Sequence, residues 1–235
     1  MYAGRAALYD LIYNWKDYAA EAALLAEILA AHGVAPGARI LEAACGTGNH
    51  LLHLRGQFAV AGFDLHDEML AVARPKLPGV PLFQADMTAL SVREPYDALL
   101  CLFSSIGNLC DTHALRAAAA AFARALRPGG VLLVEPWFTA EQWDDGRPTG
   151  QLYSTPDLVL ARVSMAGRDG DLALFDLSWL VAARGRPVEH FVERHRMWLC
   201  PRETMRAAFE EAGFKVHFDP DGLGTGRGLF IGQRN

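Results

Sequence analysis

A glycine-rich turn between an apolar strand and a helix constrains this chain more than any other feature. The segment from Leu41 to Gly48 reads Leu-Glu-Ala-Ala-Cys-Gly-Thr-Gly, and leucines at helical spacing follow it. Such a turn places backbone N–H groups and a helix N-terminus at the carboxyl end of a strand, where nucleotide-like ligands bind. Strand and helix patterns then alternate through residues 38–135, which predicts a parallel sheet with helices on both faces.

The remaining pattern predicts an insertion and a return to the core. Apolar runs joined by glycine-containing turns follow Glu135, and they predict an antiparallel meander at Val159–Met165, Leu172–Val181 and Val188–Leu199. A helix at Pro201–Ala212 and strands at Phe214–Phe218 and Gly228–Gly232 end the expected order. We therefore expect one domain over residues 1–235, with a cofactor-binding core at 33–135, a lid or dimerisation subdomain at 137–199, and the last core elements at 200–235.

Composition excludes several classes of protein. The 235 residues carry a formal net charge of −5, which argues against a nucleic-acid partner because phosphate binding needs clustered Lys and Arg. No uncharged apolar run is long enough to span a membrane, and no secretory signal pattern opens the sequence. The four cysteines form no C-x-x-C pair, so we expect reduced thiols, no metal and a cytoplasmic location.

Acidic residues at the ends of the first three predicted strands indicate the ligand. The spacing Glu42-x-x-x-Gly46-x-Gly48 does not suit the pyrophosphate of a nicotinamide dinucleotide, whereas Glu42 can accept from an α-amino group. Asp64 can bind ribose hydroxyls, and Asp86 can accept from an adenine amino group. Met69 and Met87 are placed to flank the adenine ring. Each feature alone also fits a tight turn, a helix cap or a loop carboxylate, but together they predict S-adenosylmethionine.

The same residues resemble the class I S-adenosylmethionine-dependent methyltransferases, and most of all the N,N-dimethyltransferases of amino sugars carried on thymidine diphosphate. The resemblance runs over nearly the whole chain. It rests on Tyr9-Asp-Leu-Ile-Tyr13, Ala44-Cys-Gly-Thr-Gly48, Phe103-Ser-Ser-Ile-Gly107, Val134-Glu-Pro-Trp137 and Gly226-Arg-Gly-Leu-Phe230. It implies a Rossmann-like fold with a seven-stranded, mainly parallel sheet and a small antiparallel lid.

The resemblance also implies roles for individual residues. Tyr13 and Tyr18 are expected in a flap over the methyl-transfer site, where Tyr13 serves both cofactor and catalysis. With the acidic residues and methionines already named, the expected cofactor contacts are Ala44, Cys45, Gly46, Gly48, Leu65, Leu102 and Phe103. The expected acceptor contacts are Ser105, Asn108, Glu135, Trp137, Arg162, His190 and Arg227. The expected product of the cofactor is S-adenosylhomocysteine.

Departures from the family pattern leave the acceptor open. The loop between Tyr13 and Lys16 is shorter, Asn108 stands where Tyr or His is usual, and Trp137-Phe-Thr139 replaces Trp-Trp-Phe. The leading hypothesis is N-methylation of a small-molecule amine, best matched by a nucleotide-linked amino sugar, by direct in-line transfer. The alternatives are methyl transfer to another small molecule at oxygen or nitrogen, and a non-catalytic cofactor-binding module. A homodimer is also considered.

A proton acceptor is expected on the last predicted strand of the meander. In Glu189-His-Phe-Val-Glu-Arg-His195, residues two apart share a face, so Glu193 and His195 lie together and His190 lies opposite. We predict that Glu193 and His195 contact the acceptor or remove its proton, a solvated face with ion pairs being the alternative. Arg227, between glycines, fits either a hairpin turn or a diphosphate contact, and Arg162 is a second candidate for that contact. His50 and His53, one turn apart, have too few partners for a metal site.

Overall fold

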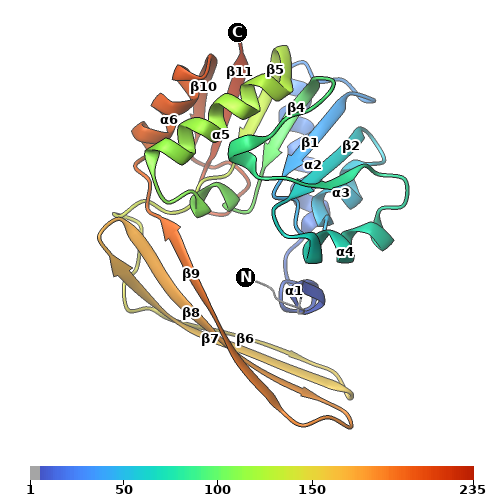
Figure 1. Cartoon of the computed structure of the whole chain (residues 1–235), viewed down its shortest axis with the longest axis vertical. Coiled ribbons are helices and arrows are strands. Elements are labelled where there is room, and N and C mark those ends of the chain that lie inside the picture. Colours follow the sequence, from blue (N-terminus) through green and yellow to red (C-terminus); the bar gives the residue numbers. More distant parts are fainter. Residues whose placement is uncertain (1–5) are drawn as a thin grey trace.

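A seven-stranded mixed sheet forms the centre of the molecule, as described by a computed structural model over residues 6–235 (Figure 1). The strand order is β10-β11-β5-β4-β1-β2-β3, and only β11 runs against its neighbours. The strands are β1 (Arg39–Ala43), β2 (Ala59–Asp64), β3 (Leu82–Gln84), β4 (Tyr96–Cys101), β5 (Leu126–Val134), β10 (Phe214–Asp219) and β11 (Leu229–Arg234). The mainly parallel sheet expected from the alternating pattern is confirmed.

Helices cover both faces of this sheet because its buried strands are apolar on both sides. Adjacent residues of β1, Ile40 and Leu41, are fully buried in two different clusters, one on each face. One cluster is closed by α2 (Tyr18–Ala31), α3 (Asn49–Leu54) and α4 (Asp67–Lys76), and the other by α5 (Thr112–Ala125) and α6 (Arg202–Glu211). A short helix α1 (Ala6–Ile12) and two 3-10 turns, η1 (Met87–Ala89) and η2 (Ser105–Asn108), complete the helical elements of the described chain.

Two helix starts follow the capping rule that their sequences suggest. The carboxylate of Asp17 accepts from the backbone N–H of Ala20 at 2.9 Å, and Asp111 does the same for Ala114 at 2.8 Å. Helix α5 ends at Ala125, and β5 begins directly at Leu126, so that the segment Pro128-Gly-Gly130 lies within the strand. A register irregularity against β4 at this end of the strand accommodates Pro128 and the two glycines.

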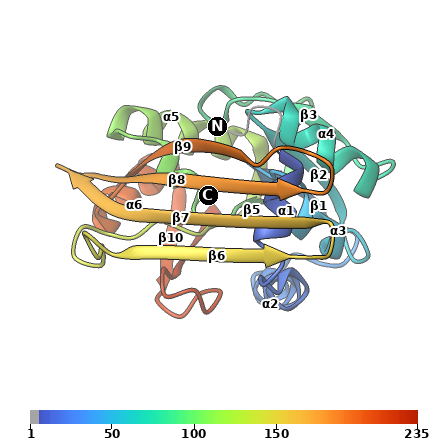
Figure 2. The ribbon, with the colours of Figure 1, turned by 90° about the horizontal axis from the view of Figure 1, so that it is seen from below.

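A separate four-stranded antiparallel sheet lies across the carboxyl edge of the central sheet (Figures 1 and 2). Its order is β6-β7-β8-β9, with β6 (Pro148–Ser154), β7 (Leu158–Asp169), β8 (Leu172–Ala183) and β9 (Glu189–Trp198). Three of these strands match the predicted meander. The fourth, β6, was not predicted from the sequence. It is an edge strand that contains Pro148, Gly150 and polar residues, which have a low propensity for strands. Along residues 6–235, no helix has the length and apolarity to cross a membrane.

Candidate active site

One large cavity lies between the two sheets. Its volume is about 930 Å³, and its walls come from the carboxyl ends of the core strands, the segment after α1 and the inner face of the antiparallel sheet. Most residues that the sequence singled out line this cavity: Tyr13, Ala44, Gly46, Asp64, Leu65, Met69, Asp86, Met87, Phe103, Ser105, Asn108, Trp137, Arg162, His195 and Arg227. The parallel sheet therefore gathers side chains that are far apart in the chain at one edge.

The glycine turn is built around the Asp64 carboxylate at the end of β2. Asp64 is buried, and its two oxygens accept from the backbone N–H groups of Gly46 and His66, each at 2.9 Å. Gly46 has a positive φ of 55°, and a Cβ there would lie 3.4 Å from the Met69 side chain. Gly48 serves a different purpose, because a Cβ on it would lie 2.5 Å from Leu77. It allows α3 and α4 to pack closely and does not line the cavity.

A small side pocket of about 40 Å³ opens beside the large cavity, and four further predicted cofactor contacts line it: Tyr18, Glu42, Cys45 and Leu102. Glu42 is 3 % exposed, and its Oε2 atom has no hydrogen-bond partner among the described residues. A buried carboxylate oxygen without a partner is costly unless a ligand supplies a donor. The pocket thus has the size and the charge to receive an ammonium group.

Replacing Asp64 by alanine is expected to weaken S-adenosylhomocysteine binding by roughly 1–3 kcal/mol, or about 5- to 150-fold. The substitution removes a buried acceptor and frees two backbone N–H groups of the turn. Isothermal titration measures the change. Asp67→Ala is the matched control, because Asp67 is an exposed residue of α4 paired with Arg74. Equal affinity of the Asp64 variant and the wild type would contradict this placement.

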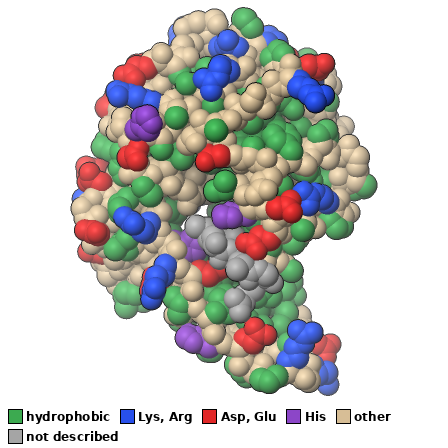
Figure 3. Space-filling view, viewed as in Figure 1, with side chains coloured by type: hydrophobic (Ala, Val, Ile, Leu, Met, Phe, Trp, Pro, Cys, Tyr) green, Lys and Arg blue, Asp and Glu red, His purple; other side chains and the backbone are tan. Residues whose placement is uncertain are grey.

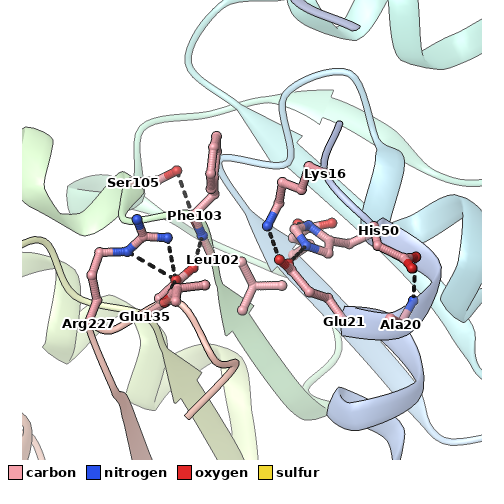
Figure 4. A network of polar contacts seen from close by, with 12 residues as sticks. Lys16, Ala20, Glu21, His50, Leu102, Phe103, Ser105, Glu135 and Arg227 are labelled. Carbon is pink, nitrogen blue, oxygen red and sulfur yellow. Dashed lines mark hydrogen bonds and ion pairs between the residues drawn. The ribbon is translucent and has the colours of Figure 1, made fainter. Parts of the chain in front are cut away.

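A chain of alternating charges leads from the side pocket to the N-terminal segment (Figure 4). His50 of α3 bonds Glu42 through Nδ1 at 3.2 Å and Glu21 through Nε2 at 2.9 Å, and Glu21 also pairs with Lys16. Burial by itself lowers the pKa of His50, but the hydrogen bonds and charges of Glu21 and Glu42 outweigh it and raise this pKa to about 9. The imidazole is therefore protonated at neutral pH.

The raised pKa of His50 predicts a pH-dependent stability. The stabilisation by the charged ring is fully present below the ordinary His pKa of about 6.5 and is lost as the pH rises through about 9. We expect the difference in unfolding free energy between the wild type and His50→Gln to shrink by up to about 3 kcal/mol over this window. Urea denaturation at pH 6.5, 7.5 and 9.5 measures it. A difference that does not vary with pH would show that the ring is neutral.

Glu135, at the end of β5, organises the other side of the site instead of facing the acceptor as expected. It is fully buried and lines neither pocket. Its Oε2 accepts from the backbone N–H of Phe103 at 2.7 Å, and its Oε1 accepts from Thr225 at 2.7 Å and from Arg227 Nε at 3.1 Å. Phe103 has a positive φ of 50°, which is uncommon for a bulky residue. Glu135 thus holds two cavity residues, Phe103 and Arg227, in place (Figure 4).

His195 and Glu193 of β9 both turn inward, so the solvated-face alternative is wrong. The His195 ring stacks on Phe175 with centroids 5.1 Å apart, and its Nε2 is buried without a hydrogen-bond partner among the described residues. Glu193 Oε2 lies 3.9 Å from that nitrogen and accepts from Trp179 Nε1 at 3.0 Å. Only His195 of the two lines the cavity. His190 is exposed on the opposite face of β9, away from the cavity, because neighbouring strand residues alternate.

Three further predicted residues complete the walls. Tyr13 accepts a hydrogen bond from Arg162 of β7 at 2.9 Å and meets the Phe103 ring edge-on at 5.2 Å, so it joins the antiparallel sheet to the core. Trp137 stacks on Phe175, and its buried Nε1 has no acceptor within the described chain. Asp86 is exposed at the cavity rim and caps η1 by accepting from Thr88 N at 2.8 Å, which matches the helix-cap interpretation and leaves its other oxygen available.

Sequence reasoning did not foresee the role of Lys16, Glu21 and His50. His50 is the second residue of α3, in the first turn after the glycines, and its spacing to Glu42 was the available signal. Among residues 6–235, the structure holds no group of three or more His, Cys, Asp or Glu side chains arranged to bind a metal.

Known proteins with similar sequences are methyltransferases. A family described as a methyltransferase domain matches residues 40–130. The dTDP-3-amino-3,6-dideoxy-alpha-D-glucopyranose N,N-dimethyltransferase of Streptomyces fradiae is 40 % identical over 98 % of this chain and 91 % of its own. The dTDP-3-amino-3,4,6-trideoxy-alpha-D-glucopyranose N,N-dimethyltransferase of Streptomyces venezuelae is 38 % identical over 96 % of this chain and 95 % of its own.

Solved structures agree. DesVI from Streptomyces venezuelae superposes with a TM-score of 0.91 at 38 % identity, covering 98 % of both chains. CalS10, an amino pentose methyltransferase from Micromonospora echinaspora solved with S-adenosylmethionine bound, gives 0.87 at 36 % identity over 97 % of both.

The seven-stranded sheet with one reversed strand, and the glycine turn at its carboxyl edge, define a class I methyltransferase, as the sequence predicted. The chain is therefore an enzyme of this class. It belongs to the S-adenosylmethionine-dependent methyltransferase family that contains these amino-sugar N,N-dimethyltransferases.

Proposed function

We propose that the protein N-methylates an amine on a nucleotide-linked sugar. The observation that carries this proposal is that two buried atoms at opposite ends of the site lack a partner among the described residues, Glu42 Oε2 in the small pocket and His195 Nε2 in the large cavity. A cavity of about 930 Å³ has room for a cofactor together with a sizeable acceptor. The full-length relatives that act on dTDP-amino sugars support the choice of an amine-bearing acceptor.

The residues of the cofactor end fit S-adenosylmethionine. The unpartnered Glu42 oxygen suits its ammonium, the Asp64 carboxylate suits ribose hydroxyls, and Gly46 brings the backbone of the turn to the cavity wall. Further contacts are assigned to Tyr13, Tyr18, Ala44, Cys45, Leu65, Met69, Asp86, Met87, Leu102 and Phe103. When bound, this cofactor supplies a methyl group activated on a sulfonium. Gly48 acts indirectly by fixing the start of α3.

On the acceptor side, the chain positions the amine and takes its proton. His195 Nε2 is the group placed to accept that proton, and Glu193 stabilises the resulting imidazolium. Trp137 Nε1 is a buried donor available to an acceptor oxygen. Ser105, Asn108, Arg162 and Arg227 line the same cavity. Glu135 already accepts from Nε and one terminal nitrogen of Arg227, so a diphosphate could bind only through the other terminal nitrogen's side of this guanidinium.

A screen for S-adenosylhomocysteine release tests the proposed function. The probes are dTDP-linked 3-amino and 4-amino sugars, the matching sugars with a hydroxyl in place of the amine, and simple amines. Turnover of at least one amino sugar, and none of its hydroxyl counterpart, supports the proposal. Silence with every amino sugar, together with turnover of an alcohol or carboxylate, would replace it with O-methylation. Cofactor binding without any turnover would favour a non-catalytic module.

We also propose that residues 137–199 form a homodimer interface as well as a lid. The outer face of the antiparallel sheet exposes six large apolar side chains: Leu152, Val159, Val163, Met165, Leu180 and Val192. Strand register aligns Leu152 and Leu180 on either side of Ala161, so the patch is continuous across strands. A closed symmetric dimer would cover this face.

A charged residue introduced on this apolar face is expected to dissociate the dimer. Val163→Asp should shift the mass measured by light scattering from that of a dimer to that of a monomer, because an unpaired carboxylate buried in the interface opposes association. Val188→Asp, at a turn outside the patch, should leave the mass unchanged. A wild type that is monomeric at micromolar concentration would contradict the interface.

We propose a small-molecule acceptor and no nucleic-acid partner. Lys and Arg side chains are interspersed with Asp and Glu on the face shown in Figure 3, which suits a small-molecule acceptor better than a nucleic acid. The four cysteines are free thiols, as is usual in the reducing cytoplasm, where we place the enzyme. We expect catalysis without a metal, and a chelator should leave turnover unchanged.

A further inference from the structure

The buried imidazole of His50 has a geometry that its role as a packed helix residue does not require. Each ring nitrogen faces a carboxylate oxygen, with Glu42 on one side at 3.2 Å and Glu21 on the other at 2.9 Å. A neutral imidazole has one N–H and one lone pair, so one of these contacts would set a lone pair against a carboxylate. Only the doubly protonated ring satisfies both contacts.

The charges along this line alternate and balance. Lys16 and His50 are cations, Glu21 and Glu42 are anions, and all four side chains are largely buried. Burial raises the pKa of the Tyr18 phenol and of the Cys45 thiol and keeps both neutral, while two further carboxylates lie near enough to act on them, Asp10 on Tyr18 and Asp64 on Cys45. Burying the Glu21 and Glu42 carboxylates this close together would be unfavourable without the His50 cation between them.

The contact with His50 also decides which Glu42 oxygen is available. His50 engages Oε1, while Oε2 is left without a partner in the small pocket. The other end of the line is Lys16, between α1 and α2, whose Nζ lies 4.7 Å from the centre of the Phe103 ring that lines the cavity. Figure 4 shows Lys16, Glu21 and His50 in one row beside Leu102 and Phe103.

We propose that His50 is the positioning residue for the amino-acid end of the cofactor: placed between two carboxylates, it binds Glu42 through Oε1 and holds Oε2 turned toward the ligand ammonium. This role rests on the proposed function, which puts S-adenosylmethionine in this cavity. Through Glu21 and Lys16, His50 also connects the small pocket to the segment between α1 and α2. His50 itself does not touch the reacting atoms.

The test compares two ligands that differ only at the amino-acid end. S-adenosylhomocysteine carries the ammonium and carboxylate, whereas 5′-methylthioadenosine keeps the adenosine and thioether without them. In His50→Gln we expect S-adenosylhomocysteine affinity to fall about 10- to 100-fold and 5′-methylthioadenosine affinity to change less than about threefold. The matched control is His53→Gln, an exposed residue one turn along the same helix, which should bind both ligands as the wild type does.

The outcomes separate this inference from the proposed function. A wild type that binds neither ligand, or binds both equally, would overturn the cofactor placement and the inference with it. A wild type that prefers S-adenosylhomocysteine, with a His50→Gln variant that keeps the same preference or loses both ligands equally, would overturn only the role of His50.

A measurement on the wild-type enzyme does not depend on the variant folding. Long-range ¹H–¹⁵N spectra at pH 7.5 should show the His50 ring, identified by its proximity to the Tyr18 ring at 5.0 Å, protonated on both nitrogens with and without S-adenosylhomocysteine. A neutral His50 ring at this pH would overturn the proposal.

Discussion

Replacing Glu135 by alanine is expected to lower the unfolding free energy by about 3–5 kcal/mol, the cost of breaking a buried ion pair from one side. The substitution leaves the largely buried Arg227 without its carboxylate and frees the N–H of Phe103 at a strained left-handed position. Phe103 and Arg227 both line the cavity, so the same variant should also bind S-adenosylhomocysteine more weakly. Urea denaturation and isothermal titration measure the two effects.

A matched glutamate distinguishes this loss from a general effect of removing a charge. Glu203 lies in the first turn of α6, is highly exposed, and pairs with Arg206 at 3.5 Å. Glu203→Ala should cost less than about 1 kcal/mol, because exposed pairs contribute little. If Glu135→Ala were as stable as Glu203→Ala, Glu135 would not be the residue that holds this side of the site.

Replacing His195 by alanine is expected to reduce kcat by about 10²- to 10⁴-fold, the usual contribution of a positioned general base. S-adenosylhomocysteine affinity should change less than about threefold, since His195 lies on the acceptor wall and does not line the small ammonium pocket. Steady-state kinetics with an amino-sugar nucleotide that the release screen identifies measures kcat and KM separately.

The same substitution at His190 tests which face of β9 is functional. His190 is five residues away on the same strand and is exposed on its outer face, so His190→Ala should keep kcat within about twofold of the wild type. A loss at His190 comparable with that at His195 would reverse the assignment of faces. If His195→Ala raised KM and left kcat unchanged, His195 would be a binding residue and not a base.

The core of the fold was predictable because its signals are local. Alternation of apolar strands with amphipathic helices requires a sheet covered on both faces, and the glycines fix where the first strand ends and α3 begins. The antiparallel insertion was also visible, except for β6. An edge strand needs little apolar surface of its own, so Pro148, Gly150 and Gln151 gave no strand signal.

The site was predictable in its residues more than in their roles. Period-two geometry put Glu193 and His195 on one face, and the structure adds that this face is the buried one. Glu135 follows a core strand and so was expected at the acceptor, but its carboxylate is fully used by Phe103, Thr225 and Arg227. Strand position brings a residue to the edge of the sheet, whereas its neighbours decide where the side chain points.

The sequence by itself determined the parallel core, the glycine turn from Leu41 to Gly48, and the acidic residues that suit S-adenosylmethionine. These depend on short-range periodicity and on backbone geometry that only glycine adopts easily. Only the tertiary structure joined Lys16, Glu21 and His50 to Glu42, and Tyr13 to Arg162, because such contacts link segments far apart in the chain. The packing of α1 and α2 against the two sheets brings these partners together, and no local pattern specifies that packing.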